Sequence, residues 1–129
     1  MLVNRGTVSG LSLRAAIVAS FAFTGIAWAQ GAPRSFDASP DVYKVAAKND
    51  QYLVIQVTWA PGQRDADHSH PVSAGYYLTN CKLRFFLPDG KTRDAERKRG
   101  YSFVQDAIPS HSAQNIGKSV CKIVMFEPK

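Results

Sequence analysis

The histidines are the residues whose type and spacing best support chemistry in this chain. There are three, and two of them, His68 and His70, are separated by one residue. On a strand, residues i and i+2 point to the same face, so these two imidazoles are expected to project together. His111 lies some forty residues later, between turn signals. A fold that brings it beside the pair would complete a three-nitrogen metal site. The alternative is that each is an ordinary hydrogen-bonded or surface histidine.

These spacings resemble those of the cupins, the RmlC-like jelly-roll superfamily. Their first motif places a glycine five residues before His-x-His, as Gly62 stands before His68 and His70. Their second motif ends in a histidine, three residues and an asparagine, as His111 and Asn115 do. The resemblance covers about residues 50–127.

The sequence also departs from the family pattern. The glutamate of the first motif falls at Ala74 or Gly75, so the usual fourth ligand is missing. The glycine that closes this motif falls near Cys81, and the Pro-x-Gly of the second motif falls on residues 106–108. The resemblance therefore implies a metal site on His68, His70 and His111 that lacks the family's carboxylate.

A three-histidine site of this kind suits a divalent transition metal: Zn, Fe, Mn, Ni or Cu. Losing the carboxylate leaves one more net positive charge at the site. Gln105, Gln114, Asp67 or a water molecule are the candidates for a fourth ligand.

The elements that must position these residues are short strands. Turn signals recur at roughly 8–12-residue spacing, and no window outside the first thirty residues has a helical period. The predicted strands are Val42–Ala47, Tyr52–Trp59, Gly75–Leu78, Lys82–Leu87, Tyr101–Gln105 and Val120–Glu127. We therefore expect an all-β domain, and the resemblance implies a cupin-type antiparallel barrel or jelly roll.

The N-terminal segment has the features of an export signal. Arg5 and Arg14 precede an apolar run that ends in Ala27-Trp28-Ala29. The run ends at Ala29, fifteen residues after Arg14, which is short of the roughly 20 that span a bilayer. We expect residues 1–29 to be a cleaved signal peptide, 30–40 an extended arm and 41–129 the β domain. The product would be periplasmic or secreted, without a membrane anchor; an uncleaved anchor is the alternative.

The net charge is +6, and basic residues cluster between Lys91 and Arg99. Asp94 and Glu96 interrupt this run and no aromatic residue is interleaved with it, which indicates a solvated hairpin. We expect no nucleic-acid partner.

The cysteine count is even, with Cys81 and Cys121 alone in the chain. In an exported protein this favours a disulfide. The jelly-roll arrangement that the resemblance implies would place their strands side by side. Two separate buried thiols are the alternative.

The sequence thus predicts an exported small cupin that binds a small molecule beside a metal. Trp59, Tyr76, Tyr77, Phe85 and Phe103 are candidates for the pocket wall, and Arg64 or Arg84 for holding a substrate carboxylate. Catalysis by the metal, non-catalytic ligand binding, and a structural homodimer with an empty site stay open as functions. Fold resemblance alone assigns no reaction.

Overall fold

The alternation of buried and exposed side chains along strand β2 (Tyr52–Trp59) shows how this chain builds its core. Leu53, Ile55, Val57 and Trp59 are buried, and the residues between them are exposed or half-buried. Strand β9 (Cys121–Pro128) pairs with β2 along its length and repeats the alternation. The inward side chains of both strands form a core closed by Leu83 and Ala113.

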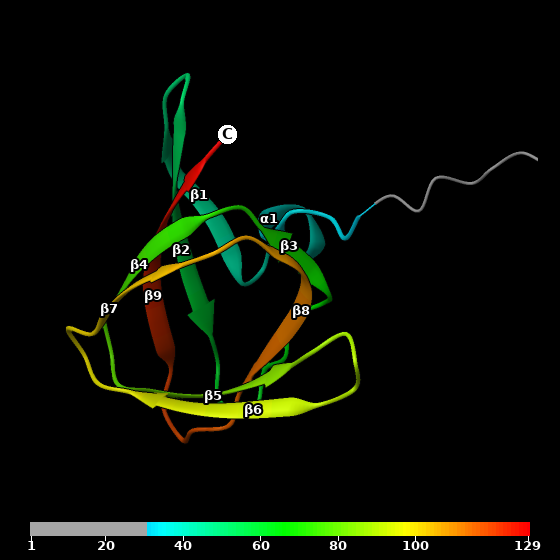
Figure 1. Cartoon of the computed structure of the whole chain (residues 1–129). Coiled ribbons are helices and arrows are strands. Elements are labelled where there is room, and N and C mark those ends of the chain that lie inside the picture. The colour runs from blue at the N-terminus through cyan, green and yellow to red at the C-terminus, as the bar shows by residue number, and fades with distance from the viewer. Residues whose placement is uncertain (1–30) are drawn as a thin grey trace, which may run out of the picture.

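The computed structural model describes residues 31–129, in which nine strands form two antiparallel sheets (Figure 1). One sheet has the order β1-β2-β9-β4-β7 and the other β3-β8-β5-β6. The remaining bounds are β1 Tyr43–Lys48, β3 His68–His70, β4 Ser73–Tyr77, β5 Cys81–Phe86, β6 Thr92–Arg97, β7 Ser102–Gln105 and β8 Ile108–Asn115. The all-β class is confirmed, and each of the predicted strands is present with bounds shifted by at most two residues.

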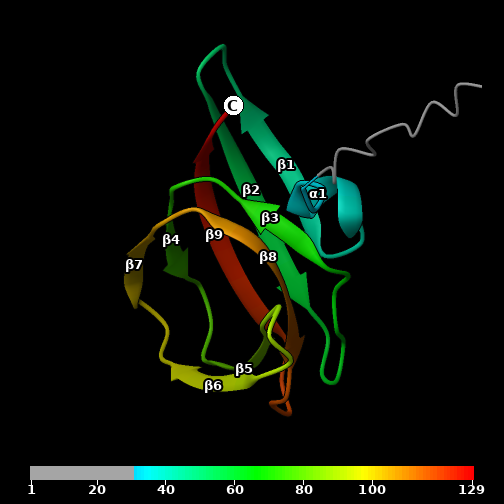
Figure 2. The ribbon, with the colours of Figure 1, turned by 45° about the vertical axis from the view of Figure 1, so that its right-hand side comes forward.

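Residues 34–40, predicted as part of an extended arm, include a short helix, α1 (Ser35–Ala38). The helix lies against β1 and β3 (Figure 2). Ser69 of β3 donates its backbone N–H to the carbonyl of Pro33, which fixes the arm to the strand that carries two of the histidines. The predicted signal peptide lies outside the described residues. Within residues 31–129 no helix has the length and apolar character needed to span a bilayer.

The basic segment predicted as a solvated hairpin forms the hairpin of β5 and β6. Arg84 and Asp94 pair across its exposed face with an N–O distance of 2.7 Å. One face of β6 is not simply solvated, however, because Arg93, Ala95 and Arg97 line a cavity described below. Charge alone could not indicate which face of the strand turned inward.

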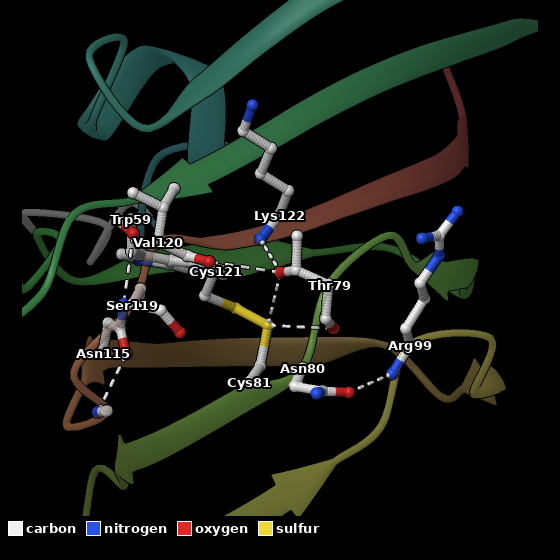
Figure 3. Close-up of a disulfide and its surroundings, with 11 residues drawn as sticks. Trp59, Thr79, Asn80, Cys81, Arg99, Asn115, Ser119, Val120, Cys121 and Lys122 are labelled. Carbon is white, nitrogen blue, oxygen red and sulfur yellow. Dashed lines mark hydrogen bonds between the residues drawn. A yellow bond between two sulfur atoms is a disulfide. The ribbon is translucent and has the colours of Figure 1, made fainter.

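Cys81 and Cys121 form a disulfide with a Cα–Cα distance of 5.1 Å (Figure 3). Each cysteine is the first residue of its strand, β5 in one sheet and β9 in the other. The bond therefore ties the two sheets together at one end. The Thr79 hydroxyl accepts a hydrogen bond from the backbone N–H of Lys122, which joins the neighbouring turn to β9.

Replacing both cysteines with alanine should lower the free energy of unfolding by about 4 kcal/mol, because the bridge restricts a loop of about 40 residues in the unfolded chain. Urea unfolding of the double variant against the oxidised wild type measures the loss. Reduction of the wild type should reproduce it. Equal stability of oxidised and reduced protein would contradict this expectation.

Candidate metal centre

The register between β3 and β8 brings the three histidines together. His68 and His70 project from the same face of β3, and His68 lies directly opposite His111 on β8. All three are buried, and one ring nitrogen of each lies within 4.8 Å of the others. The predicted convergence of the imidazoles is therefore present in the structure.

Two motif residues fix this register. Gly62 has φ 79°, a left-handed conformation that favours glycine. Its N–H donates to the Asn115 carbonyl at 2.8 Å, and the Asn115 N–H donates to the carbonyl of Gln63 at 2.9 Å. These bonds hold the turn before β3 against the end of β8, so Gly62 and Asn115 position the histidines without touching them.

The hydrogen bonds of His68 and His70 fix which nitrogen of each ring carries the proton. His68 Nδ1 lies 2.7 Å from the carbonyl oxygen of Ala66, which can only accept. His70 Nδ1 lies 2.6 Å from Oε1 of Glu127. Both Nδ1 atoms therefore donate, and in neutral rings both Nε2 atoms present lone pairs.

Those two Nε2 atoms lie only 2.9 Å apart. Two lone pairs at this distance repel each other unless a proton or a metal ion lies between them. The separation is close to the about 3–3.5 Å expected for two nitrogens bound to one metal ion. The pair thus fits a metal ion as ligands.

His111 supplies the third nitrogen. Its Nε2 is buried without a hydrogen-bond partner, an arrangement that costs about 1–3 kcal/mol. The ring stacks on Phe85, with the planes 5° apart. Burial, and then the charges of His68 and His70, lower the pKa of His111 to about 3. It is therefore neutral at physiological pH, and a metal ion is a partner that would satisfy its nitrogen.

Tyr43 of β1 brings an oxygen to the same cluster. Its hydroxyl lies 3.2 Å from His68 Nε2 and donates to Asp65 Oδ2 at 2.8 Å. Because its proton is directed to Asp65, the hydroxyl turns an oxygen lone pair toward the histidines. Burial, and then the charge of Asp65, raise the pKa of Tyr43 well above its usual value.

Asp65 is a buried carboxylate that organises this side of the site. It accepts hydrogen bonds from Tyr43, from Trp59 Nε1 at 3.0 Å and from the backbone N–H of Ala113 at 2.6 Å. Burial raises the pKa of Asp65, and these hydrogen bonds partly offset that effect. Burial lowers the pKa of His68, which the Ala66 carbonyl and Asp65 oppose.

Glu127 is the second buried carboxylate, and it lies behind His70. Its other oxygen accepts from Arg34 of the N-terminal arm at 2.7 Å. Burial raises its pKa, but the hydrogen bonds from His70 and Arg34 outweigh burial and hold the pKa of Glu127 below its usual value. Glu127 is thus ionised and keeps the Nδ1 proton on His70.

Asp67, one of the fourth ligands suggested by the sequence, does not join the cluster, whereas Gln105 lines the cavity beside it. Gln114 donates to the carbonyl of Gly62, Gln105 donates to the hydroxyl of Ser73, and Asp67 is exposed. Sequence reasoning missed Tyr43, Asp65 and Glu127. A signal did exist for Glu127, which stands in the inward phase of β9 after Cys121, Ile123 and Met125.

A cavity of about 150 Å³ opens beside His70 and His111, between the two sheets. Its walls include Trp59, Tyr77, Phe85 and Phe103, as the sequence suggested, whereas Tyr76 is not among the lining residues. Arg64 and Arg84, the candidates for holding a carboxylate, do not line it either. The Arg64 guanidinium stacks on Phe86 and bonds to Ser112, and Arg84 pairs with Asp94.

No protein-family model matches this chain, and no curated protein sequence matches it significantly. Solved structures do match. A cupin domain from Bordetella pertussis is 20% identical with a TM-score of 0.62, covering 78% of this chain and 98% of its own. This chain has the cupin fold.

Two further solved structures share the fold. An RmlC-like cupin family protein with a double-stranded β-helix from Methanocaldococcus jannaschii has a TM-score of 0.55 at 11% identity and covers 67% of this chain and 78% of its own. A protein with a double-stranded β-helix domain from Klebsiella pneumoniae has a TM-score of 0.53 at 19% identity, and the match covers 67% of this chain and 76% of that protein. At these identities the likeness concerns the fold alone.

An aromatic ring lies against one of the two positions to which the cupin motif assigns its glutamate. Of the two candidate positions, Gly75 is buried on the inward face of β4, whereas Ala74 belongs to the opposite face. A Cβ atom added to Gly75 would overlap the ring of Phe103 on the paired strand β7. The ring of Phe103 walls the cavity instead.

We expect the metal-free protein to lose stability as the pH falls below about 6.5, the pKa of an unperturbed histidine. The unfolded chain then binds protons that His68 and His111, with their lowered pKa values, do not bind in the folded state. Each such group contributes a slope of up to about 1.4 kcal/mol per pH unit.

Urea unfolding between about pH 5 and pH 7 measures this slope, which His111→Asn should reduce. All three histidines of the chain belong to the cluster, so no other imidazole contributes. A free energy of unfolding that does not change over this range would contradict the lowered pKa values of His68 and His111.

Proposed function

We propose that this protein is an exported metal-binding cupin that holds one divalent transition metal on His68, His70 and His111 and binds a small molecule in the adjoining cavity. The observation that carries the proposal is the 2.9 Å contact between two Nε2 atoms whose rings donate their Nδ1 protons elsewhere. The unpartnered Nε2 of His111 supports it independently.

Tyr43 is the residue we assign to complete the ligand set. Three imidazole nitrogens and one phenol oxygen suit Zn, Fe, Ni or Cu, and also Mn. Asp65 is placed to take the phenolic proton, because it already accepts the hydrogen bond of that hydroxyl. Asp65 and Glu127 together bring two buried carboxylates into contact with the ligands, which offsets the charge lost with the family's glutamate.

The bound metal would act as a Lewis acid toward a ligand in the cavity. The chain's own contribution would be orientation and proton handling: Glu127 and the Ala66 carbonyl hold the two Nδ1 protons, and Tyr43 with Asp65 provides a proton-transfer pair. This pair favours an enzyme. The absence of any aspartate or glutamate among the described residues that line the cavity favours the alternative, non-catalytic ligand binding.

Export is part of the proposal because the Cys81–Cys121 bridge is typical of oxidising compartments. It agrees with the signal peptide expected at residues 1–29, and the periplasm or the extracellular space is the proposed location.

Protein purified without a histidine tag should contain close to one metal ion per chain by elemental analysis. His70→Ala should lower this content by an order of magnitude or more. Glu127→Gln should weaken metal affinity about 10–100-fold, because residues that hold a ligand's second nitrogen have effects of this size. Glu96→Gln is the matched control, since Glu96 is exposed on β6. Metal content unaffected by His70→Ala, with the β fold intact, would refute the site.

The role of Tyr43 can be tested by spectroscopy. With Cu(II) or Fe(III) bound, the wild type should show a phenolate-to-metal charge-transfer band, which Tyr43→Phe should abolish while the histidines still bind the metal. Tyr77→Phe removes another buried phenol of the same cavity and should leave the band unchanged. A band that persists in Tyr43→Phe would exclude Tyr43 as a ligand.

A further inference from the structure

Strand β6 turns two arginines toward the cavity. Arg93, Ala95 and Arg97 alternate with outward-facing residues, and all three line the cavity. The small side chain of Ala95 lies between the long side chains of Arg93 and Arg97, so the cavity wall projects less at this point. Because β6 and β7 are the edge strands of their sheets, the arginines lie where the sandwich opens.

Both guanidinium groups lie against aromatic rings and not against carboxylates. Arg93 lies 5.3 Å from the centre of the Phe85 ring, and Arg97 lies 4.8 Å from that of Tyr101. Among the described residues neither forms an ion pair. Among the described residues, the one hydrogen bond that their side chains donate runs from Arg97 Nη1 to the backbone carbonyl of Glu96. The rings thus hold two uncompensated charges at the cavity.

The charges of the cavity favour an anion. Among the described residues that line it there is no aspartate or glutamate, and the two arginines are the only permanent charges. Both charges affect Tyr77 of the cavity wall: burial raises the pKa of Tyr77, and the charges of Arg97 and Arg93 oppose that rise. A guanidinium is planar and pairs with a carboxylate through two parallel hydrogen bonds.

The size of the cavity limits what accompanies that anionic group. A closed apolar cavity of about 150 Å³ holds one benzene molecule, and this cavity has the same volume, about 150 Å³, but is open on one side. Phe85, Phe103, Leu83, Ile123 and Met125 supply apolar walls. The fitting ligand has one anionic group and an apolar body about the size of one ring.

We propose that the cavity binds a small organic carboxylate, whose carboxylate group pairs with Arg93 and Arg97 and whose apolar body lies toward His70 and His111. The direction of the body rests on the proposed function, because it presents the ligand to the metal centre. The arginine subsite itself depends only on Arg93 and Arg97 of β6 and does not require the metal centre.

The test uses benzoate as the probe, with benzyl alcohol and benzylamine as neutral and cationic counterparts of equal size. Amide chemical-shift titration by NMR gives the affinity of each for the protein in metal-free and zinc-loaded form. Benzoate should bind at least about tenfold more tightly than either counterpart, which is the range for hydrogen bonds to a charged group.

Arg93→Gln and Arg97→Gln should each weaken benzoate binding about tenfold. Arg99→Gln is the matched control, because it removes the same charge from the turn after β6 and does not line the cavity. Ala95→Leu keeps both charges but fills the space between them, so it should weaken benzoate binding as well. Equal affinity of benzoate and benzyl alcohol, or equal effects of Arg97→Gln and Arg99→Gln, would overturn the proposal.

The two forms of the protein separate this proposal from the metal centre. Arginine-dependent binding to the metal-free protein supports the subsite even if no metal is found. Binding that requires zinc and ignores both arginine variants would show that the metal holds the carboxylate; the subsite would then be wrong while the metal centre stood.

Discussion

The contact between His70 and Glu127 is the interaction on which the arrangement of the site most depends. It joins β3 of one sheet to β9 of the other, and Arg34 adds the N-terminal arm to the same carboxylate. A buried carboxylate is costly unless it is paired, so Glu127 requires both partners in place. The same bond orients the His70 ring and directs its Nε2 to the cluster. The packing of the two sheets, the docking of the N-terminal arm and the orientation of the His70 ring therefore all depend on the same buried carboxylate.

The two ends of the cavity differ in chemistry because they come from different strands. At the inner end β1, β3 and β8 contribute a phenol and imidazoles, which are potential metal ligands. At the open end β6 contributes permanent cations. The Phe85 ring contacts both ends, because it stacks on the His111 ring and also lies beside the Arg93 guanidinium. One apolar ring thus connects the two polar ends.

Much of the fold and part of the site could be predicted from the sequence. Strands such as Tyr52–Trp59 identify themselves by alternation, and His-x-His guarantees a shared face on any strand. Tyr43 and Asp65 could not be found in this way: Tyr43 reaches His68 from another strand, and Asp65 lies in the turn before β3, outside any alternating pattern. Glu127 does stand in the inward phase of β9, but its partner His70 is 57 residues away in the chain. The inward face of β6 was missed for another reason: its side chains are charged on both faces, so no pattern of hydrophobicity indicates which arginines line the cavity.

The close approach of Gly75 and Phe103 has an evolutionary consequence. In this backbone a glutamate at position 75 and the present Phe103 ring compete for the same volume. A side chain at position 75 would therefore require the Phe103 ring to move, so we expect substitutions at the two positions to be coupled. An oxygen that reaches the histidines must then come from elsewhere in the fold, as the Tyr43 hydroxyl does from β1.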